Sequence, residues 1–341
     1  MTINNSDIKF YWIYLIGFFL ILSLPLLAVP PLFHPAPWGK TIIFRIVLSI
    51  LIFFFTYNII YKKEVFAFKK IEPKAVKQIL SILGITLSFY LLSTIFSQDL
   101  SFSFWGSPWR AGGFLNFFFY ALLSVFVFLV VRERDWKKIW NFSISIGVLV
   151  TLFGISQYFS LFSNFIVSSE TVVASTMGNS SLLAIYLSFL FFIALSLGLK
   201  EKVNYKKAAY FSAFALFIFG ISISGARSTY LGIIVGLFFF FFFYPKKIAK
   251  IKIITGAFLL LSIFSVYYLN SSPTPPDIIK NNATLSRTFS YFASRTSLKT
   301  AITDLSGARF STWSIGLRAI KEKPILGWGP ENFSIGFDKY Y

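Results

Sequence analysis

The sequence contains no cysteine and a single histidine, His34, among its 341 residues. The missing thiols exclude disulfide bonds and thiolate metal sites, and one histidine cannot build a multi-histidine metal centre. Charge is also scarce, since only 13% of the residues are charged while 56% are hydrophobic. A soluble domain of this length would carry far more charge, so the composition predicts an all-α, polytopic membrane protein.

Apolar runs of about 20 residues, the length that crosses the core of a bilayer, recur along the chain. Nine transmembrane spans are predicted: Tyr11–Val29, Thr41–Tyr61, Val76–Phe96, Gly113–Val131, Ile139–Phe159, Ser180–Leu199, Ala208–Ser222, Ser228–Tyr244 and Ile253–Leu269. They divide the chain into a transmembrane helical domain, residues 1–269, and a polar segment, residues 270–341. The Pro- and Asn-rich stretch Ser271–Ala283 indicates a linker at the start of that segment.

The formal net charge of +19 raises the possibility of a nucleic-acid partner, but the placement of the charges argues against it. With the N-terminus inside the cell, more than half of the 32 basic residues fall in cytoplasmic segments: Lys9, 62–77, 132–138, 200–207 and 246–252. This is the positive-inside pattern of membrane proteins. We expect no nucleic-acid partner. The expected location is the inner (cytoplasmic) membrane, in contact with membrane lipids, with residues 270–341 outside.

The polar segment ends in a stretch, 308–341, with a helical pattern in its first half. Apolar residues recur at spacings of three and four and form one stripe: Phe310, Trp313, Leu317 and Ile320. Pro324 is expected to end this helix, and a Gly-Trp-Gly-Pro turn follows at 327–330. One interpretation is an amphipathic helix on a membrane surface with its aromatic side down. That interpretation does not exclude chemistry on the polar side.

This stretch resembles the large outer loop of the O-antigen ligase and polymerase family, bacterial membrane enzymes that move lipid-linked glycans. The resemblance rests on Arg309, Trp313, the run PILGWGPENF from Pro324 and the final tyrosine pair. Four further pieces are similar to family patterns in the same order: FWGSPWRAGG at 104–113, LFGISQYF at 152–159, TMGNSSLLAIYLSF at 176–189 and SISGARSTYLG at 222–232. The resemblance implies a fold like that of the GT-C glycosyltransferases.

The sequence departs from the family at the general base. Family ligases carry a catalytic histidine later in the outer loop, followed by further membrane helices, so the base is expected beyond Tyr341, in a longer enzyme. His34 lies among four prolines, does not match that histidine and is interpreted as a rigid surface residue. Asp304, Glu331 and Asp338 are nearby carboxylates that could act as a base, but none has a convincing partner in the sequence.

Arginines are the strongest candidate catalytic residues. Arg227 follows a very short Gly225-Ala226 hairpin, which places it at the N-terminus of the eighth span, where backbone donors and a guanidinium fit phosphate oxygens. An interfacial arginine that reaches for water is the alternative. The resemblance implies a second catalytic arginine, Arg309. Candidate substrate-binding residues are Arg110, for which an interface anchor is the alternative, and Asn179, Trp313 and Arg318.

The function implied by the resemblance is glycan transfer from a polyprenyl-diphosphate carrier to a lipid, glycan or protein acceptor, with inversion of the anomeric configuration. A ligase, a polymerase and a protein O-oligosaccharyltransferase all fit. No metal or cofactor is expected, because arginines can stabilise the leaving diphosphate and the chain has no Asp-x-Asp motif. A transporter or flippase for the same lipids is a different class. It would be expected to carry ionisable residues in mid-span, which the predicted spans do not show.

The charge pattern predicts the topology. Reporter fusions at Lys70, Lys137 and Asn204 should report a cytoplasmic location, and a fusion at Ser286 an external one. The physical reason is the concentration of Lys and Arg in the segments that contain the first three positions. A cytoplasmic signal from the Ser286 fusion would contradict the orientation of the whole chain.

Overall fold

The computed structural model describes residues 5–27, 35–62, 73–108, 110–161, 173–243 and 310–341, with isolated helical positions between 253 and 268. This part of the chain is helical and contains no strand, which confirms the all-α prediction. Five of its helices are long and apolar enough to cross a membrane: Trp38–Tyr61, Val76–Ile95, Glu133–Tyr158, Ser180–Lys200 and Asn204–Ser224. Shorter apolar helices cover Tyr11–Leu26, Phe114–Val130 and Ser228–Phe240. The protein is therefore a polytopic membrane protein, and nine crossings stay a prediction.

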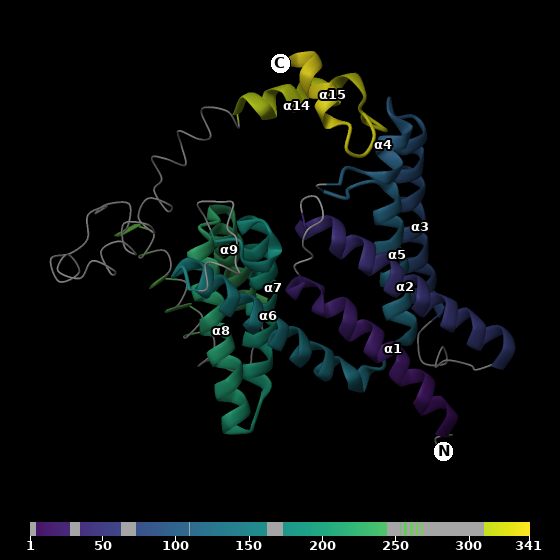
Figure 1. Cartoon of the computed structure of the whole chain (residues 1–341). Helices are drawn as coiled ribbons and strands as arrows, with labels where there is room; N and C mark the ends of the chain where they lie inside the picture. The colour runs from purple at the N-terminus through teal and green to yellow at the C-terminus, as the bar shows by residue number, and fades with distance from the viewer. Residues whose placement is uncertain are drawn as a thin grey trace. The chain divides into compact units, whose positions relative to one another are not determined.

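The chain forms two compact units, one of Met1–Ile146 with Ser311–Tyr341 and one of Gly147–Phe310. The first unit contains α1 (Asn5–Ser23), α2 (Pro35–Lys62), α3 (Pro73–Ile95), α4 (Leu100–Trp105), α5 (Phe114–Val130), α14 (Phe310–Glu322) and α15 (Phe333–Tyr340) (Figure 1). The second contains α7 (Ser180–Lys200), α8 (Asn204–Ser224) and α9 (Arg227–Phe243). Helix α6 (Trp136–Tyr158) contributes its first half to the first unit and its second half to the other. The predicted ninth span and the linker Ser271–Ala283 lie outside the continuously described residues.

The core of the first unit lies among α1, α2 and α5, whose spans are apolar on nearly every side. Leu48 and Tyr14 are almost fully buried there, and the ring of Phe126 meets that of Tyr14 edge-on at 5.7 Å between centroids. The amide of Asn58 donates a hydrogen bond of 3.0 Å to the Tyr14 hydroxyl. This polar pair satisfies two groups that would be costly to leave unpaired inside a bilayer.

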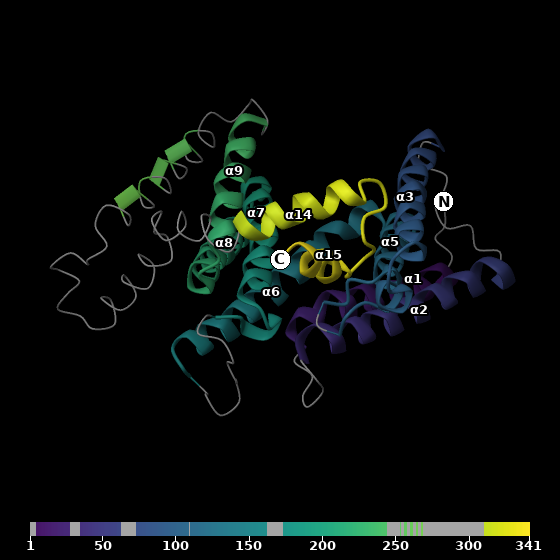
Figure 2. The same cartoon turned by 90° about the horizontal axis from the view of Figure 1, so that it is seen from above.

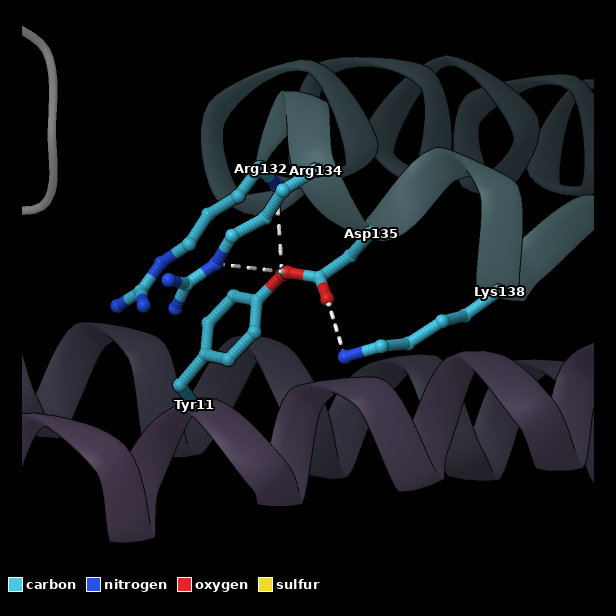
Figure 3. Close-up of polar contacts among 5 residues, drawn as sticks. All are labelled: Tyr11, Arg132, Arg134, Asp135 and Lys138. Carbon is cyan, nitrogen blue, oxygen red and sulfur yellow. Dashed lines mark hydrogen bonds and ion pairs between the residues drawn. The ribbon is translucent and has the colours of Figure 1, made fainter.

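A second polar cluster ties the start of α1 to the start of α6 (Figure 3). The Tyr11 hydroxyl donates to Asp135 Oδ2 at 2.6 Å, and Lys138 Nζ donates to Asp135 Oδ1 at 2.9 Å. The guanidinium of Arg132 lies 3.9 Å from the centroid of the Tyr11 ring. Asp135 is buried, so these partners offset the cost of desolvating its charge. The cluster fixes the register of α1 against α6.

Helices α3 and α5 lie side by side and carry the short helix α4 at one end (Figure 1). The rings of Tyr90 and Phe117 stack between them at 4.1 Å. Helix α4 was not predicted. It begins because the Asp99 side chain accepts a hydrogen bond from the backbone N–H of Phe102, which is a standard N-cap. The loop that follows returns to α5 through Gly106 and Gly113, whose backbones approach too closely for any side chain at either position.

In the second unit, α7 and α8 pack as a close antiparallel pair. The predicted Gly-Asn turn is present: Gly178 is left-handed, and the Asn179 side chain caps α7 by accepting from the N–H groups of Ser181 and Leu182. The predicted minimal hairpin is also present, because α8 ends at Ser224 and α9 begins at Arg227. Gly220 of α8 lets α6 and α7 approach, since a Cβ there would lie 2.7 Å from the methyl of Thr151 in α6 and 2.8 Å from Leu187 in α7.

Substituting Gly220 with valine should destabilise the protein by about 1–3 kcal/mol, the usual cost of overpacking a core. Thr151 cannot move aside easily, because it is buried and its hydroxyl donates to the Gly147 carbonyl. Thermal unfolding monitored by fluorescence-detected gel filtration measures the effect. Gly232→Val is the matched control, since a Cβ at that position of α9 meets no atom within 4 Å. Equal losses in the two variants would contradict the close packing at Gly220.

Candidate functional site

Helix α14 and the turn after it form the polar end of the first unit. The helix ends at Glu322, two residues before Pro324, as predicted. Its buried side carries Ile315 and Ala319, whereas the residues of the predicted apolar stripe are all exposed. The stripe is therefore an outer surface of this unit, and the opposite side of α14 makes the internal contacts.

Trp328 joins α14 to α15, and the two helices lie next to each other (Figures 1 and 2). Its indole Nε1 donates to the carbonyl of Ala319 at 3.1 Å, and the ring is 8% exposed. A Cβ at Gly336 of α15 would lie 3.1 Å from this indole, so glycine permits the contact. The ammonium of Lys323 lies 4.4 Å from the ring centroid and adds a cation–π interaction.

An ion pair joins the C-terminal ends of these two helices. Glu322 of α14 accepts a hydrogen bond of 2.7 Å from Lys339 of α15 and another from the Tyr340 hydroxyl. Both hydrogen bonds lower the pKa of Glu322, and the one from Lys339 has the larger effect. The cluster is solvent-exposed, so it orients the helices more than it stabilises them.

The turn between α14 and α15 docks on α4 through buried polar groups. The Ser103 hydroxyl donates to the Pro330 carbonyl at 2.9 Å, and the Asn332 amide donates to the Ser103 oxygen at 3.0 Å. Both side chains are buried. Gly329 has a φ of +95°, and a Cβ there would lie 2.3 Å from Ser97. Glycine is therefore required at this position both for the backbone conformation and for the close approach.

Glu331 completes this docking on the loop between α4 and α5. Its Oε1 accepts from the backbone N–H of Gly112 at 2.8 Å, and its Oε2 accepts from the Ser107 hydroxyl at 3.2 Å. A Cβ at Gly112 would come within 2.4 Å of Oε1, so only glycine leaves room for the carboxylate. We call these contacts of Glu331 with Gly112 and Ser107, together with those of Asn332 and Pro330 with Ser103, the latch.

The latch holds two residues in a backbone conformation that L-residues rarely adopt. Ala111 has a φ of +49° and Glu331 a φ of +63°. Each such residue costs of order 1–3 kcal/mol, and the surrounding contacts must compensate. Backbone strain of this kind concentrates at functional sites, which makes the latch and the loop it holds the candidate site of the first unit.

Arg110 lies on this loop, next to the strained Ala111. Its backbone N–H donates to Ser107, and its side chain is exposed. Within the described part of the chain, its guanidinium makes no hydrogen bond or ion pair. The latch therefore holds in place a loop whose exposed arginine has no partner among the described residues and can bind an anion.

The hairpin between α8 and α9 is the candidate site of the second unit. Gly225 is left-handed, and the Ser224 hydroxyl accepts from the N–H of Ala226. The Tyr230 hydroxyl donates to the carbonyl of Ser222 at 3.1 Å and braces the turn. The backbone of Arg227 begins α9.

Two features beside this hairpin concern Asn179 and Gln157. The Asn179 carbonyl oxygen is engaged as the cap of α7. The Gln157 side chain accepts from the N–H groups of Ala174 and Ser175 at 3.0 and 2.8 Å. This amide links the Gln-Tyr-Phe end of α6 to the segment that leads into the Gly-Asn turn, a contact that the sequence did not predict.

Comparison with protein families matches residues 212–341 to the family model of the O-antigen ligases. These residues form an O-antigen ligase domain. The match begins within α8 and includes the α8–α9 hairpin, α14, the latch turn and α15. No curated protein and no solved structure matches the chain.

The predicted site residues are distributed over both units. Four lie within the O-antigen ligase domain: Arg227, Arg309, Trp313 and Arg318. Trp313 and Arg318 are exposed on α14. Arg309 lies outside the described residues, as do His34 and Asp304. The structure brings Arg110, which precedes the domain in sequence, next to the latch turn within it.

Sequence patterns alone do not identify the residues that form the latch. Glu331 was considered only as a base without a partner, and Ser103, Ser107 and Asn332 were not singled out. Two signals were present: the adjacent glycines Gly112 and Gly113, which suggest a close approach, and the polar Glu-Asn pair after the Gly-Trp-Gly-Pro turn. Neither signal indicates which residues it contacts, because the contacts join residues more than 200 positions apart.

Replacing Gly112 with alanine should open the latch. The added methyl group displaces the Glu331 carboxylate and leaves the Gly112 N–H unpaired, a loss of about 1–3 kcal/mol. Hydrogen exchange of residues 324–340 should accelerate, with α3 and α5 unchanged. Gly84→Ala is the control, since a Cβ there meets no atom within 4 Å.

A double-mutant cycle separates this mechanism from a general loss of stability. If Gly112→Ala acts through Glu331, it should have little further effect in a Glu331→Ala background. Additive effects of the two substitutions would show that the contact between them does not hold the turn in place.

Proposed function

We propose that this protein transfers a glycan from a polyprenyl-diphosphate carrier to an acceptor at the outer face of the cytoplasmic membrane, as an O-antigen ligase does. The observation that carries the proposal is the O-antigen ligase domain at 212–341 in a chain of apolar helices. This finding supports a glycan-transferring function in a membrane. We add to it the polyprenyl-diphosphate donor, the outer location and the ligase reaction.

The chemistry requires stabilisation of a leaving diphosphate. As the bond from the anomeric carbon to the diphosphate oxygen breaks, negative charge grows on that oxygen, and the acceptor hydroxyl attacks from the opposite face. Arg227 begins α9, and the positive end of a helix dipole favours an anion at such a position. Thr229, two residues on, has a buried hydroxyl with no hydrogen-bond partner in the described part of the chain.

The remaining candidate residues fit the binding of donor and acceptor. Arg309 is proposed as the second residue that contacts the diphosphate. Arg110 has an exposed side chain with no hydrogen bond or ion pair among the described residues, and Trp313 and Arg318 lie on exposed sides of α14. Asn179 keeps the start of α7 in place through its cap, and its amide group stays a candidate contact with the glycan.

One observation bears on the transporter alternative. Arg45 lies beyond the first two turns of α2, and its Nε and Nη2 are buried without a partner in the described residues. An ionisable group inside a span is what a transporter uses. However, its guanidinium lies 5.9 Å from the centroid of the Phe119 ring, which offsets part of the cost of burial. No carboxylate pairs with Arg45 among the described residues, so none of them supplies the group that would accept and release a proton beside it. We therefore favour the transferase.

Substitution of Arg227 and Arg309 tests the proposal. With the amount of folded membrane protein held equal, Arg→Ala at either position should lower glycan transfer about 10²–10³-fold, the usual loss for one preorganised donor. Arg→Lys should rescue poorly, because lysine keeps the charge but loses the two-pronged geometry. Transfer from a lipid-linked donor by the complete gene product is the measurement.

Lys207→Ala is the matched control, since Lys207 is a basic, exposed residue near the start of α8. It should leave turnover near that of the unchanged protein. Turnover in Arg227→Ala close to that of the control would remove the central residue of the proposed mechanism.

A further inference from the structure

Helix α14 carries an apolar surface that no described residue covers. The stripe of Phe310, Trp313, Leu317 and Ile320 has exposed fractions of 65, 60, 62 and 59%. Ile325, just beyond the helix, is 82% exposed. An apolar surface of this kind on a polar segment marks a site of interaction with a membrane or a protein.

The position of the stripe on the helix is fixed by the internal contacts. Ala319 contacts Trp328 and Gly336 of α15, and Ile315 is buried on the same side of the helix, so the stripe lies on the side of α14 that points away from its partner helix. The exposed basic residues Arg318 and Lys321 lie on the same helix beside the stripe. The helix therefore has three sides: one packed, one apolar and one basic.

A hydrogen bond ties the turn after α14 to the end of α3. The Ser93 hydroxyl donates to the carbonyl of Leu326 at 2.6 Å, and Ser93 lies in the last turn of α3. Helix α3 is apolar and long enough to cross a membrane, and only 6% of its apolar window is buried. If α3 crosses the bilayer as its composition predicts, residues 325 and 326 lie level with the boundary between acyl chains and headgroups.

We propose that the stripe of α14, together with Ile325, rests in the interfacial layer of the membrane leaflet at which α3 ends. The indole of Trp313 suits the headgroup level, and Leu317 and Ile320 reach the upper acyl chains. Arg318 and Lys321 extend their aliphatic stems along the apolar layer and place their charges among lipid phosphates. The proposal does not depend on the proposed function. Under the predicted topology, the leaflet is the outer one.

Membrane docking gives α14 a second point of attachment besides the latch. The latch holds the C-terminal end of α14 through the turn that follows it, and the stripe holds the length of the helix. Together, the latch and the membrane contact fix both the height and the direction of α14.

The absence of cysteine makes the test direct, because one introduced cysteine is a unique label site. Leu317→Cys, carrying an environment-sensitive fluorophore, is reconstituted in vesicles of phosphatidylethanolamine and phosphatidylglycerol. We expect blue-shifted emission that a headgroup-level nitroxide lipid quenches several-fold more than aqueous iodide does. Ser311→Cys is the control, since it is exposed on another side of α14. Its label should show the reverse preference.

The outcomes separate the possible neighbours of the stripe. A Leu317 label as open to iodide as the Ser311 label would overturn the proposal. A Leu317 label protected from both quenchers would also overturn it, because a second copy or another protein would then cover the stripe. Replacing phosphatidylglycerol with phosphatidylcholine should weaken lipid quenching. Unchanged quenching would overturn the part assigned to Arg318 and Lys321.

Discussion

The placement of the C-terminal helices depends on a few buried hydrogen bonds at the end of α4. Helices α14 and α15 have a small apolar core of their own around Trp328, and the largest apolar residues of α14 point outward. Hydrophobic burial therefore contributes little to holding them against the rest of the first unit. The Ser103 and Asn332 side chains supply the attachment instead. Hydrogen bonds are directional, so they specify one position where an apolar contact would permit several.

Glycine makes this attachment possible, because the groups that bond are backbone groups. The Gly112 N–H and the Pro330 carbonyl can be reached only if the two loops touch. Gly106 and Gly113 bring the α4–α5 loop close upon itself, and Gly329 brings the turn against α4. A side chain at any of these positions would separate the partners by more than a hydrogen bond can span. Shape and polarity thus act together in the latch.

The helices could be predicted from the sequence because the bilayer imposes a simple requirement on long segments. Backbone groups must pair within the segment, so each apolar run that the structure describes is a helix. Local chemistry predicted several helix ends: Pro324 after α14, the Gly225-Ala226 hairpin, and the Gly-Asn turn before α7. Helices α4 and α15 escaped prediction because they are short, and a helix of one or two turns leaves too little periodicity to recognise.

The latch could not be predicted, because its chemistry is divided between distant parts of the chain. Nothing in a single sequence indicates that a glutamate after a proline contacts a glycine pair that lies more than 200 residues away. The exposed stripe was different. Its spacing predicted an apolar face, and the face is present, but only the structure shows that the opposite side is the packed one.

The geometry of Glu331 bears on its part in the proposed chemistry. A general base needs a free lone pair directed at the acceptor hydroxyl. Both carboxylate oxygens of Glu331 already accept hydrogen bonds, one from Gly112 and one from Ser107. Withdrawing either oxygen would leave the Gly112 N–H unpaired or loosen the strained loop that carries Arg110. These contacts fit the role of a positioning residue that holds the loop carrying Arg110.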